Sequence, residues 1–200
     1  MKTMVASEFI KSFWQYYIDL EKQVIDTQRY VTFDARNNAT FSMEYIKLLQ
    51  VICSEIDVVG KVIGQHFNPA FVVDNKTNIN KWGYQVQTAF PTIQTKRVIF
   101  WNEVELIPWA KWVYVVSAKG YPVLDKTVNA KTPFWWNAYN GVKHQRTSLG
   151  SGKRPNYMRA NLKTVTNALS ALYIMEQLML DSYNPANIAG IEKSRAFRMK

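Results

Sequence analysis

Apolar side chains recur at steps of three and four residues along two stretches in the first third of the chain. In residues 7–28 these positions are Phe9, Phe13, Tyr16, Leu20 and Val24. In residues 41–67 they are Tyr45, Leu48, Leu49, Ile52, Ile56, Val59 and Ile63. This spacing lines one side of an α-helix, so each stretch is predicted to be a helix with one buried face. Thr40 or Ser42 supplies the N-cap of the second helix, and Pro69 follows its end.

Two further helices are predicted in the second half of the chain. The first, residues 133–146, contains WWNAYNGVKHQR, and the second begins after Asn156 and continues to Asp181. The apolar positions of the latter are Met158, Leu162, Val165, Leu169, Leu172, Met175 and Met179. Such a series suits packing between antiparallel helices. SLGSGKRPN between the two helices is typical of a mobile loop, and the basic tail after Tyr183 is expected to fray.

Residues 69–132 have a different pattern. KRVIFW, EVELI and KWVYVV are short, β-branched and aromatic, and AKGYP is a turn signal. We expect an insertion with a small antiparallel sheet and a short helix near residues 82–90; an irregular aromatic-rich cap is the alternative. The predicted fold class is mainly α: an antiparallel four-helix bundle, residues 5–68 and 133–183, with the β-containing insertion between its second and third helices. Its 200 residues suffice for a single domain.

Composition narrows the class of protein. The chain is 48% apolar and 20% charged, which is typical of a globular protein and excludes a disordered one. Its apolar runs are too short to span a membrane, and the early charges at the N-terminus differ from a secretory signal. The single cysteine, Cys53, excludes an intramolecular disulfide and favours a reducing compartment, so we expect a soluble, cytoplasmic protein with no membrane contact.

The net charge of +10 is unevenly distributed. No Asp or Glu occurs between Lys126 and Met175. The positive charges of that segment are Lys126, Lys131, Lys143, Arg146, Lys153, Arg154, Arg159 and Lys163. A block of one sign attracts polyanions, so RNA or another polyanion is the expected partner. A solvated basic face without a partner is the alternative.

Within WWNAYNGVKHQR, helical geometry separates two sets of side chains. Residues four apart lie above one another, so Trp136, Asn140 and His144 form one stripe, with Lys143 beside it. The other stripe, which suits burial, is Trp135, Tyr139 and Val142. An amide can orient an imidazole, an imidazole transfers protons near neutral pH, and Lys143 with Arg146 can bind phosphate. The alternative is a helix whose aromatic side chains are core and whose histidine is structural.

A late helix of this kind, PFWWNAYNGVKHQR, followed by ANLKTVTNALSALYIMEQLML, resembles the HEPN superfamily, and in particular uncharacterised bacterial and phage HEPN-like proteins. The resemblance implies a helical bundle, a homodimer and an RNA-directed function, because many members are metal-independent ribonucleases. Their motif is an arginine, often followed by a polar residue, and a histidine, with four to six residues between the arginine and the histidine. His144 falls on the motif histidine and Asn140 on the polar position, whereas Tyr139 occupies the place of the arginine and Arg146 follows the histidine.

Two classes of function follow from this resemblance. The first is a metal-independent ribonuclease in a phage-defence or mobile-element setting, with His144 as the acid or base, Asn140 orienting it and Arg146 holding phosphate. The residues expected to bind nucleic acid are Lys143, Lys153, Arg154 and Arg159. The second class is an inactive HEPN-like binding or adaptor module, or a regulator that binds a protein from a defence system, and the missing arginine favours it. Neither class needs a cofactor.

Other residues have both a structural and a functional interpretation. Glu55 and Asp57 are expected to pair with a basic residue of the 133–146 helix. Cys53 lies in an apolar run and is expected to be a small core residue, and the scattered His and Cys residues predict no metal site. Some aromatic side chains of the insertion either stack on bases of a single strand or fill the core: Trp82, Trp101, Trp109 and Trp112.

Overall fold

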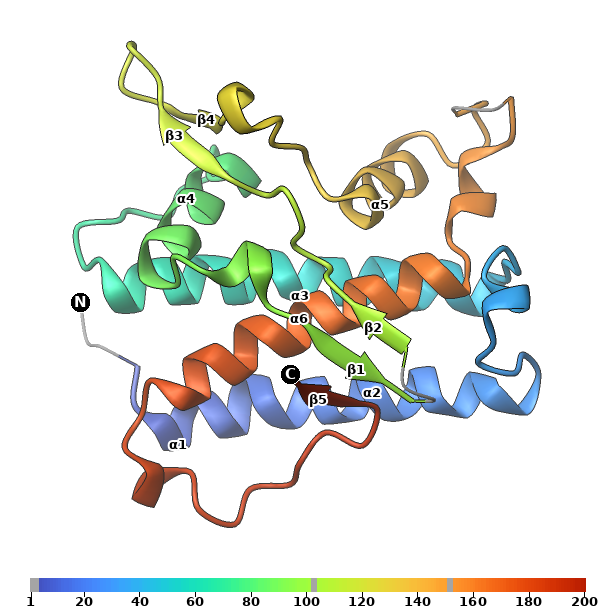
Figure 1. The fold of residues 1–200 in the computed structure, drawn as a ribbon, viewed down its shortest axis with the longest axis horizontal. Coiled ribbons are helices and arrows are strands. Elements are labelled where there is room, and N and C mark those ends of the chain that lie inside the picture. The colour runs from blue at the N-terminus through green and yellow to red at the C-terminus, as the bar shows by residue number, and fades with distance from the viewer. Residues whose placement is uncertain (1–3, 102–103, 151–152) are drawn as a thin grey trace.

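The computed structural model describes residues 4–101, 104–150 and 153–200, which Figure 1 shows as a ribbon. The helices are α1 Ala6–Phe9, α2 Gln15–Asp26, α3 Met43–Phe67, α4 Ile79–Ala89, α5 Phe134–His144 and α6 Leu162–Asp181. A π-helical turn, Ile10–Trp14, joins α1 to α2 without a break. The strands are β1 Val98–Phe100, β2 Val104–Leu106, β3 Tyr114–Val116, β4 Pro122–Leu124 and β5 Phe197–Met199. Glu103 of the predicted EVELI strand, the preceding Asn102, and residues 151–152 of the predicted loop lie outside the described residues.

The four helices expected from periodicity are present, and one of them starts later than expected. The Ser42 hydroxyl accepts a hydrogen bond from the Tyr45 amide at 3.1 Å, so Ser42 is the N-cap of α3. The last long helix was expected to start just after Asn156, but Asn156–Arg159 forms a 3₁₀ turn and α6 starts at Leu162. The Asn161 side chain determines that start, because it accepts a hydrogen bond from the Thr164 amide at 3.0 Å.

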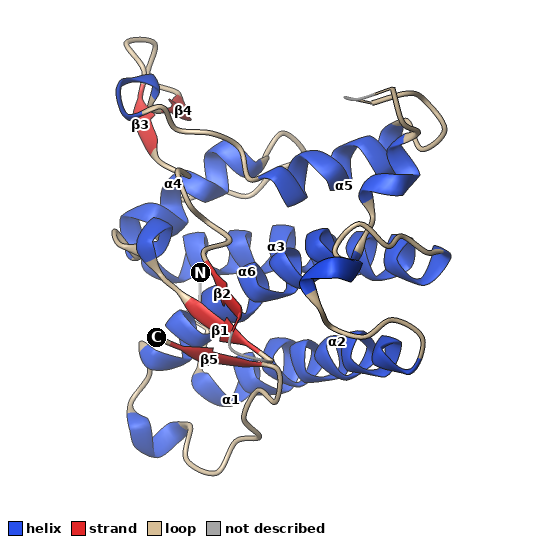
Figure 2. Cartoon of the chain, turned by 45° about the vertical axis from the view of Figure 1, so that its right-hand side comes forward, coloured by secondary structure: helices blue, strands red, loops and turns tan. Residues whose placement is uncertain are grey.

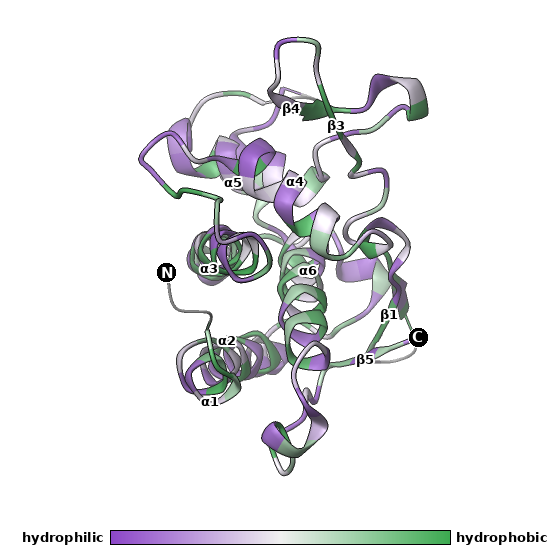
Figure 3. Ribbon diagram, turned by 90° about the vertical axis from the view of Figure 1, so that its left-hand side faces the viewer, coloured by the Kyte–Doolittle hydropathy of each residue, from purple (hydrophilic) through white to green (hydrophobic). Residues whose placement is uncertain are grey.

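The helices are arranged in three layers (Figure 3). The continuous α1–α2 helix forms the lowest layer, α3 and α6 form the middle one, and α4 and α5 cover α3 from above. β1 lies between β2 and β5 in an antiparallel sheet that packs against α6, while β3 and β4 form a separate hairpin above α4 (Figure 2). The core is continuous through the three layers.

The two helices of the middle layer run in the same direction. At their starts, the Leu162 amide donates to the Thr40 carbonyl at 3.0 Å. At their ends, the rings of His66 and Tyr183 lie 5.7 Å apart. α2 runs opposite to them, since its last turn lies beside the start of α3. α5 also runs opposite to α3 and α6 (Figure 1), so the four helices expected from periodicity alternate in direction along the chain.

The predicted fold class is wrong, because the described chain is a mixed α/β structure with five helices, counting α1–α2 as one, and two small sheets that contain five strands. The physical reason is the insertion: it supplies α4, which packs on α3, and strands β1 to β4, whose backbone groups pair in the two sheets. One strand, β5, comes from the C-terminal tail and not from the insertion.

The C-terminal tail is held in place, contrary to the expected fraying. The Glu21 carboxylate on α2 is buried and accepts hydrogen bonds from the Ser194 hydroxyl and from the amides of Arg195, at 2.8 Å, and Ala196, at 3.2 Å. The Tyr17 hydroxyl donates to the same carboxylate at 2.6 Å. A buried carboxylate needs such donors, and the tail supplies three of them before it pairs with β1.

Five indole rings join the upper layer to the middle one. They belong to Trp82, Trp109, Trp112, Trp135 and Trp136, which we call the tryptophan cluster. The ring centroids of Trp109 and Trp112 lie 4.2 Å apart, and those of Trp109 and Trp135 lie 5.0 Å apart, edge to face. Trp82 lies 5.9 Å from Trp136, so the cluster connects α4 to α5. Such contacts stabilise beyond the area that they bury.

Indole N–H groups of the cluster tie it to α3 and α6. Trp82 Nε1 donates to Asp57 Oδ1 on α3 at 2.8 Å, and Trp109 Nε1 donates to the Ala171 carbonyl on α6 at 3.1 Å. Gly60 of α3 leaves room for Trp82, because a Cβ atom at this position would lie 2.4 Å from the Trp82 ring. The upper layer therefore sits directly on the α3 backbone.

Two acidic side chains lie in the middle layer without a basic partner among the described residues. Glu176 of α6 is fully buried, and neither of its carboxylate oxygens has a hydrogen-bond partner. Burial, together with the charge of Glu55, raises the pKa of Glu176 well above its usual value. Burial also raises the pKa of Glu55 to about 7. At this buried position the neutral form of the Glu176 carboxyl is therefore favoured over the charged form.

Gly60→Ala is expected to lower the free energy of unfolding by about 1–3 kcal/mol, because the new methyl group overlaps the Trp82 ring. In an ordinary helix interior the same change stabilises by up to about 1 kcal/mol, so the sign of the effect is diagnostic. Ser54→Ala on the exposed side of α3 is the control and should change stability little. Urea unfolding measures both; a Gly60→Ala protein as stable as the parent would contradict this packing.

Glu176→Gln is expected to stabilise the protein at pH 8 and not at pH 4. The folded pKa of Glu176 is raised, so its stabilising contribution is complete at low pH and is lost as the pH rises from the unfolded value toward the folded one. Glutamine does not ionise, so the variant should be more stable than the parent at pH 8. Urea unfolding at both pH values tests this, with Asp19→Asn, an exposed acid of α2 that has no ion pair among the described residues, as control. Equal gains at both pH values would refute it.

Candidate nucleic-acid interface

The helix α5 has one buried and one exposed face, as its sequence predicts. Trp135 and Val142 are fully buried, and Trp136 and Tyr139 are nearly so. Trp136 belongs to the stripe of Asn140 and His144, and exposure increases along this stripe toward the end of the helix. Trp136 is buried, Asn140 is half-buried and His144 is exposed. The first turn of α5 therefore packs, and its last turn reaches solvent at the edge of the upper layer (Figure 2).

His144 is the last residue of α5 and is solvent-accessible. Among the described residues its ring has no hydrogen-bond partner, and no hydrogen bond joins it to Asn140. Lys143 precedes it, with its Nζ 5.3 Å from the centroid of the Tyr139 ring. Positive charge at the C-terminal end of a helix is favourable, because the last carbonyl groups carry partial negative charge. The imidazole is thus presented beside cations, with no side chain that orients it.

The loop after α5 is organised by Asn156, a residue that the sequence did not single out. Asn156 is 4% exposed, and its Nδ2 donates to the Gln145 carbonyl at 2.9 Å. Its backbone amide donates to the Ser148 carbonyl at 3.0 Å, and its Oδ1 accepts from Arg159 Nη1 at 3.5 Å. The available signal was an Asn directly after a Gly- and Pro-containing loop, since Asn side chains often bind nearby backbone groups.

Five cations share this region, and we call them the basic cluster: Lys143, Arg146, Lys153, Arg154 and Arg159. Local contacts bring them together. The Arg146 carbonyl accepts from the Tyr157 amide at 3.0 Å, and the Arg154 carbonyl accepts from the Gly150 amide at 2.9 Å. Arg159 reaches α5 at Gly141, where a Cβ atom would lie 2.9 Å from Arg159 Nη1. The predicted binding residues therefore lie on one loop and helix end.

None of the cations between Lys126 and Lys163 has an acid within ion-pair distance in the part of the chain that the structure describes. Arg159 is half-buried, and the other four members of the basic cluster are exposed. Cations with an acidic partner lie elsewhere: Arg29, Arg36, Lys47, Lys61, Lys81, Arg97 and Lys200. The charge of the basic cluster is therefore available to an external anion.

The acids expected beside α5 have other surroundings. Asp57 pairs with Lys61 on its own helix and accepts the Trp82 N–H, because both partners lie closer than any cation of α5. Glu55 lies toward Glu176 and has no ion pair with α5, so the expected pairing is wrong for both residues. Cys53 is a buried core residue, as predicted, and burial raises the pKa of its thiol.

Of the four tryptophans expected to stack on bases, three are buried and one is exposed. Trp82, Trp109 and Trp112 are fully buried in the tryptophan cluster, which corrects their proposed surface role, since large indoles join the layers there. Trp101 is 36% exposed. Phe134 at the start of α5 is 45% exposed, and Lys163 Nζ lies 5.6 Å from its ring centroid. Phe134 is a surface aromatic side chain that the helical pattern assigned to neither stripe.

Comparisons with protein-family models, with curated proteins and with solved structures find no match to this chain. In the described ranges, no three His, Cys, Asp or Glu side chains are grouped so that they could hold a metal ion. None of the described helices is both long and apolar enough to cross a membrane.

Asn156→Ala is expected to loosen the loop without unfolding the protein. It removes the bond to the Gln145 carbonyl and the contact with Arg159, so backbone amides of residues 145–150 should exchange with deuterium at least about tenfold faster, which corresponds to about 1.4 kcal/mol. Hydrogen exchange by mass spectrometry measures this. Asn137→Ala on the exposed side of α5 is the control. Unchanged exchange in the loop would show that Asn156 does not hold it.

Proposed function

We propose that this chain binds RNA through the basic cluster and does not cleave it. The observation that carries the proposal is the grouping of charge: the five cations of the cluster lie on one loop and helix end and have no acidic partner among the described residues, whereas cations such as Arg36, Lys47 and Arg97 are paired. Phosphates of a nucleic acid supply evenly spaced negative charges that such a cluster neutralises, with release of bound counterions. The cluster lies on a helix end and an Asn156-bound loop, so the cations are partly ordered before binding.

The geometry around His144 favours binding over cleavage. Cleavage by attack of a ribose 2′-hydroxyl needs a group that accepts a proton, a group that donates one and a cation at the phosphate. Only one imidazole is at hand, and no side chain of the described residues hydrogen-bonds it. Tyr139 stands at the arginine position of the HEPN motif. Its phenol carries no positive charge, and it is only 7% exposed under the Lys143 side chain, so it cannot replace the arginine at the phosphate.

The resemblance to HEPN-like proteins supports RNA as the polyanion and an inactive binding or adaptor module as the class. A cytoplasmic homodimer that serves a phage-defence or mobile-element system is part of the same proposal. Light scattering on the purified protein tests the dimer. Capture of a specific defence protein without RNA binding would favour the regulator that binds a protein.

Replacement of Arg146, Lys153 and Arg154 by Gln should weaken binding of a single-stranded RNA at least about tenfold at low salt. Each lost phosphate contact should also lower the slope of log affinity against log salt by about 0.7, so the triple change lowers it by about 2. The control is Lys11, Lys22 and Lys119 to Gln, which removes the same charge from exposed positions elsewhere. Fluorescence anisotropy across salt concentrations measures both. Equal losses in the two variants would mean that net charge, and not the cluster, binds RNA.

The same preparations test cleavage. Wild-type protein and His144→Ala should both leave varied RNAs intact in EDTA and bind them with affinities within about threefold of each other, because His144 is one exposed group beside five cations. Cleavage that disappears in His144→Ala would establish the ribonuclease and overturn the binding-only function.

A further inference from the structure

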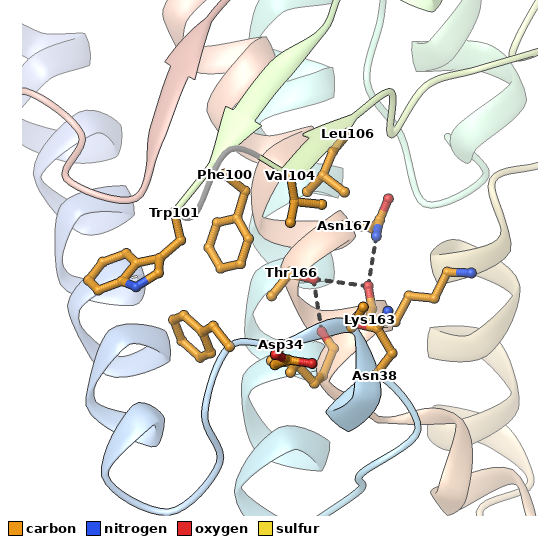
Figure 4. Close-up of a pocket in the computed structure, with 12 residues that line it drawn as sticks. Asp34, Asn38, Phe100, Trp101, Val104, Leu106, Lys163, Thr166 and Asn167 are labelled. Atoms are coloured by element: carbon orange, nitrogen blue, oxygen red, sulfur yellow. Dashed lines mark hydrogen bonds between the residues drawn. The ribbon is translucent and has the colours of Figure 1, made fainter.

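A cavity of about 220 Å³ lies between the start of α6, the β1–β2 strands and residues 33–38 (Figure 4). One wall is aromatic, from Phe33, Phe100 and Trp101. The opposite wall is polar, from Asn38, Thr166 and Asn167. The cavity is smaller than the about 300–1,000 Å³ that encloses a whole small ligand, so it admits one ring system of a larger molecule.

The polar wall offers hydrogen-bonding groups that have no partner among the described residues. Asn167 is 7% exposed, and its Nδ2 donates to the Lys163 carbonyl at 2.8 Å, which leaves its Oδ1 free to accept. The side-chain amide of Asn38 is likewise free, and it can donate and accept. Thr166 contributes less, because its hydroxyl already donates to the Leu162 carbonyl at 2.9 Å. Side-chain amides of this kind match the edges of nucleobases.

The aromatic wall presents a ring at the rim. Trp101 is 36% exposed and its ring contacts Phe33 edge to face, with centroids 5.7 Å apart. Phe33 in turn packs on Phe100 at 5.3 Å. The backbone of Trp101 has a φ of 42°, a left-handed conformation that is unfavourable for a bulky residue. An indole held in this way is a stacking platform for any nucleobase.

Charge determines which part of a nucleotide enters. Asp34 lines the cavity, and its carboxylate accepts bonds from the Arg36 guanidinium at 2.9 and 2.8 Å. An acid and apolar rings disfavour a phosphate inside, whereas a neutral base is compatible with both. Lys163 also lines the cavity, while its Nζ lies over Phe134 of α5. Arg159, one turn before Lys163, contacts α5 at Gly141, so cations lead from the basic cluster to the cavity.

We infer that this cavity holds one unpaired nucleobase of a single-stranded RNA, packed against the aromatic wall with Trp101 at its rim and hydrogen-bonded by Asn38 and Asn167, with its phosphate outside at Lys163. The inference rests on the proposed function for the rest of the strand, which lies along the basic cluster. The cavity thereby selects single strands over duplexes, because a base inside a duplex is stacked and paired and has to be extruded first.

The test is calorimetric titration of the protein with the four nucleoside 5′-monophosphates and with ribose 5-phosphate, which lacks a base. At least one nucleotide should bind saturably, and ribose 5-phosphate should not displace it. Trp101→Ala should weaken that nucleotide at least about fivefold, the lower limit for loss of one stacking contact. The control is Tyr121→Ala, which removes another exposed aromatic side chain. Absence of nucleotide binding, or equal binding of ribose 5-phosphate, overturns the inference.

A second variant fills the cavity. Val104 lines it and is 46% exposed, so Val104→Trp should abolish nucleotide binding and leave the circular dichroism spectrum unchanged; Val123→Trp on β4 is the matched control. Nucleotide binding that survives in Val104→Trp contradicts the site.

The two proposals fail separately. Gln at Arg146, Lys153 and Arg154 should weaken single-stranded RNA and leave nucleotide binding intact. RNA binding without nucleotide binding refutes the cavity alone, and nucleotide binding without RNA binding refutes the proposed function alone.

Discussion

Packing of indole rings against one another is the interaction on which the placement of α5 depends. A helix of 11 residues is marginal on its own, so α5 needs tertiary contacts to form at all. Trp135 and Trp136 provide them, since they contact the indoles of α4 and of the segment that precedes β3. Because these rings occupy the first half of α5, its last turn extends past the core. The aromatic and the basic parts of one short stretch thus have separate tasks: one attaches the helix, and the other faces solvent.

Buried acids and unpaired exposed cations lie in different regions of the described structure. Glu21 accepts hydrogen bonds from the C-terminal tail, and Glu176 is buried in the middle layer without a hydrogen-bond partner among the described residues. Acids on the surface take up cations such as Arg36 and Lys47. No acid of the described chain forms an ion pair with the basic cluster, so its positive charge is not neutralised locally and can attract a polyanion. The aromatic cavity near Lys163 lies where this field meets an apolar surface, a combination that suits a nucleotide.

Periodicity predicted the long helices because the helical repeat is a local property of the chain. It did not predict that α3 and α6 pack directly against each other, nor that the tail adds β5, because such features depend on residues far apart: Glu21 and Ser194 are separated by 173 positions. The charge block was likewise visible in the sequence. The burial of Trp109 and the role of Asn156 were not, because their partners include backbone carbonyls, which carry no sequence signal.

The most direct test of this account is to locate bound RNA on the protein by NMR. Backbone amide shifts of the 23.2 kDa protein would be followed as a short single-stranded RNA is added. The account predicts that the largest changes fall on residues 141–159, with a second set near Lys163 and Trp101. Changes confined to the β3–β4 hairpin or to the lowest layer, or no changes at all, would contradict it.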